Sequence, residues 1–301
     1  MTPTAAASPV TPLARPLRLL VVDGYTREQR DDHARGYGLT ASEAYAAELR
    51  RIEPASTAEI CCPADADASL PAGADLASYD GIFLTGSSLH IYQLEEAVTR
   101  QIALMRAIYA SGTPCFGSCW GLQVAAVAAG GTVAENPKGR EVGFARAITR
   151  TEAGRGHPLL AGRPSAFDAP AIHLDAVVAP PPGARVLAGN ALAPVQAAEI
   201  VHQGGTFWGV QYHPEFSLGQ LAAILRRGDG LLVREGFCHD AEAEQAWIAD
   251  LETLDRSPAR RDLAWRHGID AEVLDPVRRT TELRNVLAVR MKPVASARLR
   301  Q

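Results

Sequence analysis

A cysteine between two glycines is the first feature of this chain that suggests chemistry. Cys119 stands in the segment Gly117-Ser118-Cys119-Trp120-Gly121, after an apolar run and before the Ala-rich stretch 124–129. A short strand, a tight turn and a helix fit this order, and the two glycines let strand and helix pass close to each other. Backbone N–H groups at the start of such a helix favour a thiolate and can later bind an oxyanion. We therefore predict a nucleophile elbow at Cys119.

A histidine followed by a carboxylate forms the second group. His213 and Glu215 come directly after the apolar segment 206–210. If the chain leaves this strand in extended form, both side chains project to the same side. Glu215 can then fix the tautomer of the imidazole, and the imidazole can accept the thiol proton of Cys119. An isolated Gly-x-Cys-x-Gly segment is compatible with an ordinary buried cysteine, so the second group is what favours catalysis.

The elements that must position these residues alternate between strands and helices. Apolar runs predict strands at 17–24, 60–62 and 79–84, and shorter ones near 132–133 and 186–188. Helical periodicity covers 94–109, and Thr40 or Ser42 can cap a helix over 43–51. The charged, glycine-containing stretch 25–39 is predicted to be a long loop at the edge where ligands bind. It either covers part of the active site and contributes to substrate choice, or is an ordinary solvated loop.

Composition excludes several classes of function. The chain has 301 residues, 47% of them hydrophobic and 21% charged, with a net charge of −4, which is typical of a soluble globular protein. This charge balance does not indicate a surface that binds nucleic acid or membranes. No apolar stretch reaches the ~18 residues of a transmembrane helix. We expect residues 1–16 to be a disordered leader. Five cysteines without zinc-type spacing favour a reducing, cytoplasmic location, and we expect no metal and no cofactor.

The two catalytic segments together resemble the class I (triad) glutamine amidotransferase family, in particular a stand-alone domain like the glutaminase of GMP synthase. The motifs of that family read G-x-C-x-G-x-Q, which Gln123 completes here, and H-P-E. The resemblance runs from about residue 17 to about residue 225. It implies an α/β, flavodoxin-like three-layer fold with a mostly parallel central sheet. We assign 17–228 to this domain and 229–301 to a helical C-terminal extension.

The resemblance also assigns roles to particular residues. It implies a triad of Cys119, His213 and Glu215. The backbone N–H groups of Ser87 and Trp120 would form the oxyanion hole, although the turn at 86–88 reads Gly-Ser-Ser where the family often has Gly-Gly-Pro.

Further residues are implied to bind the substrate or to lie near it. The segment 171–175 resembles the H-x-D segment of the family, so we expect Leu174 to contact the substrate through its backbone and His173 to lie close by. His173 is also the rival of His213 as the base. Gly86 and Gln123 complete the predicted substrate site. Glu141 either lies near the site or forms a structural ion pair.

Three functions remain open at this stage. The first is hydrolysis of the γ-amide of glutamine through a thioester, with ammonia passed to an acceptor on another chain, because 229–301 has no phosphate-binding loop and is too short for a synthetase domain. The second is a stand-alone γ-glutamyl amide or peptide hydrolase that releases glutamate and an amine, which the long stretch 25–39 favours slightly. The third is a non-catalytic regulatory module.

The expected partners follow from these functions. They are glutamine or a γ-glutamyl amide as substrate and, for the first function, a synthase in trans. A second copy of the chain could bind through the C-terminal helices, which the sequence predicts at 241–254, 260–267, 270–274 and 276–289.

Overall fold

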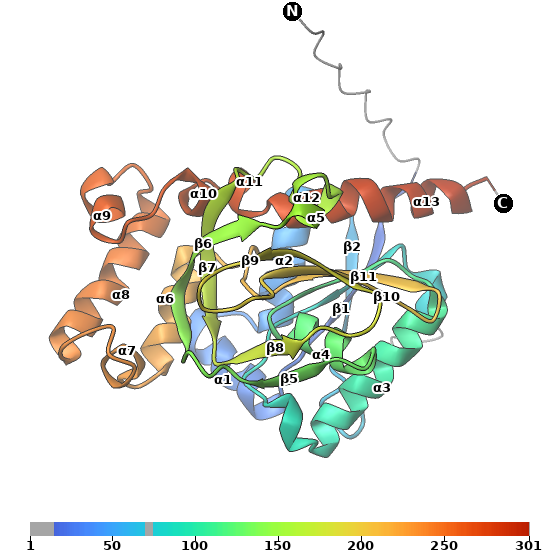
Figure 1. The fold of residues 1–301 in the computed structure, drawn as a ribbon, viewed down its shortest axis with the longest axis horizontal. Coiled ribbons are helices and arrows are strands. Elements are labelled where there is room, and N and C mark those ends of the chain that lie inside the picture. Colours follow the sequence, from blue (N-terminus) through green and yellow to red (C-terminus); the bar gives the residue numbers. More distant parts are fainter. Residues whose placement is uncertain (1–14, 70–74, 301) are drawn as a thin grey trace, which may run out of the picture.

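A nine-stranded mixed sheet forms the centre of the molecule, with strand order β2-β1-β3-β4-β11-β10-β9-β6-β7 (Figure 1). The computed structural model describes residues 15–69 and 75–300. The strands of this sheet are β1 (Arg18–Val22), β2 (Thr57–Cys61), β3 (Gly81–Leu84), β4 (Cys115–Ser118), β6 (Glu141–Arg150), β7 (Ala166–His173), β9 (Ala184–Gly189), β10 (Ala197–His202) and β11 (Gly205–Val210). β5 (Thr132–Glu135) and β8 (Asp175–Ala179) form a separate antiparallel pair. The α/β fold class is confirmed. The strands from β2 to β11 in this order are parallel, and the pairs beyond β11 are antiparallel.

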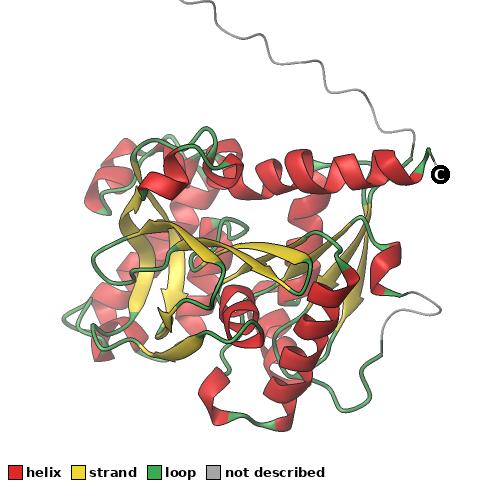
Figure 2. Ribbon diagram, turned by 45° about the vertical axis from the view of Figure 1, so that its right-hand side comes forward, coloured by secondary structure: helices red, strands yellow, loops and turns green. Residues whose placement is uncertain are grey.

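Helices cover both faces of the sheet (Figure 2). They are α1 (Arg27–Tyr37), α2 (Ala41–Ile52), α3 (Glu96–Ser111), α4 (Trp120–Ala128), α5 (Glu152–Arg155), α6 (Leu218–Arg227), α7 (Leu231–Arg234), α8 (Ala241–Arg256), α9 (Arg261–Arg266), α10 (Ala271–Leu274), α11 (Pro276–Arg279), α12 (Thr281–Val286) and α13 (Lys292–Arg298). Short 3-10 turns are η1 (Leu76–Ser78), η2 (Ile91–Gln93) and η3 (Pro158–Leu160), and η4 (Leu287–Met291) is a π-helical turn.

The alternation of side chains along β1 separates two cores. Leu20 and Val22 pack with residues of α3 and α4, whereas Leu19 and Val21 pack with α2 and with the C-terminal helices. This is the two-residue period expected of a strand that is buried on both faces. A third apolar cluster joins α6 and α8 to β6 beside the antiparallel half of the sheet.

The stretch 25–39 is a helix rather than the predicted loop. Thr26 caps the N-terminus of α1 in a capping box with Gln29, and Gly38 ends the helix with φ 92°. The polar sequence is compatible with a helix here because α1 makes few contacts with the apolar core. Its buried Arg30 pairs instead with Asp65 at 2.6 Å. Sequence polarity was therefore a poor guide to secondary structure here.

The last helices of the chain, from α12 to α13, pack against one face of the sheet, whereas α8 and α9 lie beside α6 and β6 (Figure 1). The predicted helix 276–289 is divided into α11, α12 and the beginning of η4. Leu283, Leu287 and Met291 are buried in the same cluster as Leu19 and Val21 of β1. This part of the chain therefore completes the core.

The two ends of the described chain meet at one buried carboxylate. Residues 1–14 of the predicted leader lie outside the described residues. Arg15, which falls within that prediction, pairs with Asp80 at 2.7 Å, and Arg298 pairs with the same carboxylate at 3.1 Å. Across 15–69 and 75–300, no helix combines the length and the apolar character needed to cross a membrane.

Candidate active site

The elbow is built where two parallel strands end side by side. In the register of β4 and β11, Ser118 lies opposite Val210. The next residue, Cys119, donates its backbone N–H to the Val210 carbonyl at 2.7 Å and caps the N-terminus of α4. Its φ of 52° and ψ of −103° lie in a region that non-glycine residues rarely adopt. This is the strand–turn–helix geometry that the sequence predicts, and it stores backbone strain at the nucleophile position.

The structure brings His213 and Glu215 together as the sequence predicts. His213 Nδ1 lies 2.7 Å from Glu215 Oε1, and both side chains are buried. Ser118 Oγ donates to the other carboxylate oxygen at 2.8 Å, and the His213 ring stacks on Phe216 with centroids 3.8 Å apart. The carboxylate and the stacking partner leave the imidazole little freedom to rotate. Sequence reasoning missed Ser118, although the residue stands inside the elbow motif.

The environment of His213 favours its protonated form. Burial lowers the pKa of the imidazole, but the Glu215 carboxylate and the Cys119 side chain together outweigh burial and raise this pKa to about 10. An imidazole that holds a proton this strongly is a good acceptor for the proton of the thiol. In its protonated form the same ring can donate that proton to a departing amine.

Glu215→Gln should lower the pKa of His213 and slow turnover. The substitution keeps the size of the side chain but removes the charge, so the largest contribution that raises the pKa of the imidazole is lost while burial still lowers it. We expect the NMR titration midpoint of His213 to fall from about 10 toward the ordinary ~6.5, and kcat to fall about 100-fold. Glu242→Gln, on the exposed side of α8, is the matched control.

The same pair makes the stability of the fold depend on pH. The pKa of His213 is higher in the folded chain, at about 10, than the ~6.5 of an unfolded chain. Its contribution to the free energy of unfolding is therefore complete below pH ~6.5 and is lost as the pH rises through about 10. Glu215→Gln should remove this dependence. An unchanged NMR titration in the variant would show that Glu215 does not control the histidine.

The two predicted oxyanion donors lie beside one glycine. Trp120 is the first residue of α4, so its backbone N–H is one of the donors that have no partner inside the helix. A Cβ on Gly24, just after β1, would lie 2.6 Å from Trp120 Cδ1 and 3.1 Å from Ser87 Cβ. The absence of a side chain at Gly24 therefore lets the turn of Ser87 approach the N-terminus of α4.

Gly86 is adjacent to the catalytic histidine candidate. A Cβ at this position would lie 2.7 Å from His213 Cε1, and the ring cannot withdraw because Glu215 and Phe216 hold it. Gly86→Ala should therefore displace the imidazole and lower kcat about 100-fold. Gly156→Ala is the control, because its Cβ would meet no atom within 4 Å and its φ is −105°. Steady-state kinetics of both variants checks this, and equal activities would contradict the packing argument.

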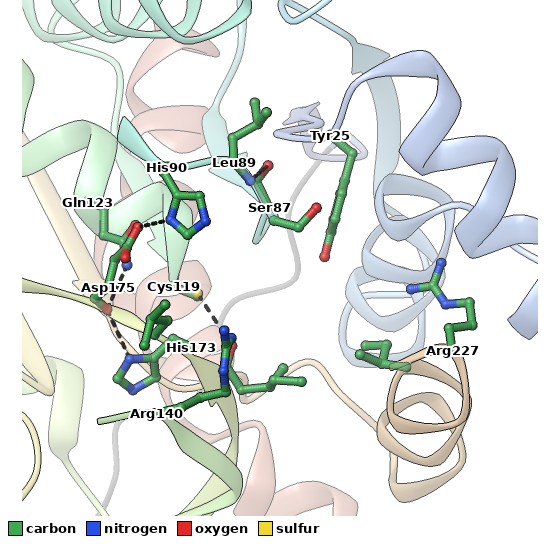
Figure 3. Close-up of a pocket in the computed structure, with 14 residues that line it drawn as sticks. Tyr25, Ser87, Leu89, His90, Cys119, Gln123, Arg140, His173, Asp175 and Arg227 are labelled. Carbon is green, nitrogen blue, oxygen red and sulfur yellow. Dashed lines mark hydrogen bonds and ion pairs between the residues drawn. The ribbon is translucent and has the colours of Figure 1, made fainter. Parts of the chain in front are cut away.

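Cys119 opens into a pocket of about 260 Å³ (Figure 3). Ser87, Gln123, His173 and Leu174, which the sequence predicts for the site, all line it. Its other lining residues are Tyr25, Ser88, Leu89, His90, Arg140, Ile172, Asp175, Ile224 and Arg227. Gln123, His173 and Asp175 lie on one side of Cys119, and Tyr25 and Arg227 lie on the other (Figure 3). We call this cavity the nucleophile pocket.

A buried polar network holds His173. Its Nε2 lies 2.8 Å from Glu141 Oε2, and its Nδ1 lies 3.0 Å from the Asp175 carbonyl. Gln196 and Asn190 both donate to Glu141 at 2.6 Å. Glu141 thus lies near the site, in contact with the pocket-lining His173, and acts there as its structural partner, so both of its predicted interpretations apply. Because both ring nitrogens of His173 are engaged, the geometry favours His213 as the base.

Of the other lining residues, Tyr25 belongs to the stretch 25–39 that the sequence places at this edge, whereas His90 had no signal in the sequence. His90, which resembled an unsupported histidine, lies with Nδ1 2.9 Å from Asp175 Oδ2. Gln123 donates its amide to the Asp175 carbonyl at 3.1 Å and so shapes the same wall. Burial, Cys119 and Asp23 raise the pKa of Tyr25, so its phenol stays protonated and can donate a hydrogen bond. Within the described ranges, no group of three or more His, Cys, Asp and Glu side chains could hold a metal ion.

Comparison with known proteins identifies the family of this chain. The model of the family described as "Glutamine amidotransferase class-I" matches residues 49–229. The chain belongs to this family. A γ-glutamyl-L-1-hydroxyisopropylamide hydrolase of a Pseudomonas species is 41% identical over 225 residues, which cover 73% of this chain and 75% of the relative. This chain is therefore a cysteine-dependent enzyme of the amidotransferase and γ-glutamyl hydrolase class.

Two further known proteins are similar to this chain over different shares of its length. The GMP synthase of Thermus thermophilus is 34% identical over 175 residues, which are 56% of this chain but 32% of that enzyme. A glutamine amidotransferase from Thermotoga maritima has a similar fold, with a TM-score of 0.62 at 16% identity. That match covers 92% of this chain and 98% of the solved one. The predicted flavodoxin-like amidotransferase fold is therefore confirmed.

Proposed function

We propose that this enzyme hydrolyses γ-glutamyl amides of small amines, with Cys119, His213 and Glu215 as a catalytic triad. One observation carries the proposal: His213 Nδ1 lies 2.7 Å from Glu215 Oε1, and the pKa of the same imidazole is raised by Glu215 and by the strained elbow cysteine beside it. Nucleophile, base and orienting carboxylate are thus connected in the order that thiol catalysis needs.

The chemistry proceeds in two steps. His213 accepts the thiol proton, and Cys119 Sγ attacks the γ-carbonyl carbon. The backbone N–H groups of Trp120 and Ser87 hold the oxyanion of the tetrahedral intermediate. The C–N bond then breaks, His213 protonates the departing amine, and a γ-glutamyl thioester remains. Water, deprotonated by His213, attacks this thioester, which releases glutamate and restores the thiol.

The two sides of the nucleophile pocket suit the two parts of such a substrate. We place the α-amino and α-carboxylate groups of the glutamyl part at the wall formed by Gln123, His173 and Leu174. With the γ-carbonyl at Cys119, the amine then points toward Tyr25 and Arg227 (Figure 3). The Pseudomonas relative, named as a γ-glutamyl amide hydrolase, supports this choice because the match covers three quarters of that enzyme.

Ammonia supply to a synthase is the second candidate. It is favoured by the similarity to GMP synthases, which this chain matches over about a third of their length. The two functions differ in the leaving group alone, because the triad and the thioester are common to both. The preferred leaving group therefore separates them.

Glutamate release by the purified chain tests the proposal. The substrates are glutamine and the γ-glutamyl amide of 2-amino-1-propanol, with Cys119→Ala as the blank and mass spectrometry of acid-quenched enzyme to detect a γ-glutamyl group on Cys119. We expect faster turnover of the amide than of glutamine. Turnover of glutamine alone would point to ammonia supply. If no substrate is turned over and a glutamine-analogue alkylating agent leaves Cys119 unmodified, the proposal is wrong.

A further inference from the structure

A recess continues the nucleophile pocket on the side away from Gln123. It has a volume of about 220 Å³, and Gln29, Asp32 and Leu231 are among its lining residues. Ser88, Ile224 and Arg227 line both the recess and the nucleophile pocket. The two spaces therefore adjoin at these side chains, within reach of a ligand whose reacting carbon lies at Cys119.

The walls of the recess are held in place by contacts between α1 and α6. Asp32 Oδ2 of α1 accepts a hydrogen bond from Arg227 Nη1 of α6 at 2.9 Å. The helices approach closely at Gly36, where a Cβ would lie 2.8 Å from Arg227 Cδ. On its other side, α1 is fixed by the ion pair of Arg30 with Asp65 at 2.6 Å. The recess is thus bounded by packed helices.

The lining of the recess is apolar on one side and hydrogen-bonding on the other. Ile224 and Leu231 offer hydrocarbon surface, whereas Ser88, Gln29 and Asp32 offer polar groups. The charge of Arg227 is compensated by Asp32, which also accepts from Arg35 at 3.2 Å. A substrate carboxylate at this end finds Arg227 already paired with Asp32, whereas a hydroxyl group can donate to the Asp32 carboxylate.

We infer that this recess binds the leaving amine, and that Asp32 makes it select amines ending in a hydroxyl over amines ending in a carboxylate. The inference rests on the proposed function and assigns its amine specificity to α1 and to Leu231 of α7. These parts lie outside residues 49–229, which match the family model. The recess is therefore built partly from segments that the family model does not match.

Two substrates that differ in one group test the inference. The γ-glutamyl amides of 2-amino-1-propanol and of alanine are identical except for a hydroxymethyl group in place of a carboxylate. We expect the wild type to prefer the alcohol, and Asp32→Asn to shift the ratio of the two kcat/KM values at least ~10-fold toward the carboxylate, because Arg227 is then available to pair with it. Asp31→Asn is the matched control: Asp31 is the exposed neighbour of Asp32 on α1 and does not line the recess.

Leu231→Phe provides a second variant that fills the recess. We expect it to lower kcat/KM for both amides at least ~10-fold relative to glutamine, because ammonia needs no room beyond Cys119. If Asp32→Asn leaves the ratio unchanged and Leu231→Phe slows glutamine and the amides equally, the recess does not bind the amine, although the enzyme remains a hydrolase. Absence of Cys119-dependent glutamate release from every substrate would instead refute the proposed function, and the inference with it.

Discussion

Cys119→Ala should lower kcat for γ-glutamyl amides by about 10⁶-fold, because members of a nucleophile–base unit act together and little remains when the nucleophile is absent. The variant should stay folded, since the Cys119 backbone N–H still donates to Val210 and α4 is still packed on the sheet. Glutamate release over long incubations, together with the circular dichroism of the variant, checks both points. Residual activity above about one per cent of wild type would exclude Cys119 as the nucleophile.

Cys119→Gly should be as inactive as the alanine variant but more stable. Residue 119 has φ 52° and ψ −103°, a conformation that costs about 1–3 kcal/mol for a side chain with a Cβ. Glycine adopts it without this strain, although its unfolded chain is more flexible by about 0.5–1 kcal/mol. We therefore expect urea unfolding to give a higher free energy of unfolding for Cys119→Gly than for Cys119→Ala. The opposite order would mean that the elbow stores no strain.

The elbow could be predicted from sequence because its chemistry depends on contiguous residues. Glycines on either side of Cys119, and a carboxylate two residues after His213, are local patterns that are visible without any knowledge of the fold. The parallel pairing of β4 with β11, which unites them, follows from the order of the strands. Gln123, Leu174 and His173 also line the pocket, because they lie at the ends of elements whose positions the fold class already implies.

The wall of the recess beside the pocket could not be predicted, since it depends on pairs that are distant in sequence. Asp32 and Arg227 come from α1 and α6, and each alone resembles a solvated charge. The prediction of a loop at 25–39 was wrong for the same reason. The polarity of α1 is balanced by Asp65 and Arg227, which local patterns do not reveal.

The arginine-rich tail gave a similarly incomplete picture. Its sequence indicates a solvated helical segment, but Arg163, in the loop after η3, lies between two carboxylates of that tail. Arg163 is 2.9 Å from Glu272 and 2.8 Å from Glu282, and all three side chains are buried. A buried charge requires partners, yet nothing in the sequence near Arg163 identifies them.

Glu282→Ala should be among the most destabilising single changes in the chain. The side chain is fully buried, pairs with Arg163 and accepts a hydrogen bond from Tyr212 Oη at 2.9 Å. Its removal leaves the buried guanidinium of Arg163 with one fewer carboxylate. We expect a loss of about 3–5 kcal/mol in the free energy of unfolding, measured by urea denaturation at neutral pH.

Two further variants separate the charge from the packing. Tyr212→Phe removes the hydrogen bond to Glu282 but leaves the ion pair with Arg163, so it should cost about 0.5–1.5 kcal/mol. The double variant Arg163→Met with Glu282→Leu removes both charges at once. It should be more stable than Glu282→Ala, because the buried guanidinium is removed together with its carboxylate and Glu272 keeps its ion pair with Arg278 at 2.9 Å. If the double variant is instead less stable than the single one, the pair contributes net stability, and the tail is held on the sheet by charge as well as by its apolar residues Leu283, Leu287 and Met291.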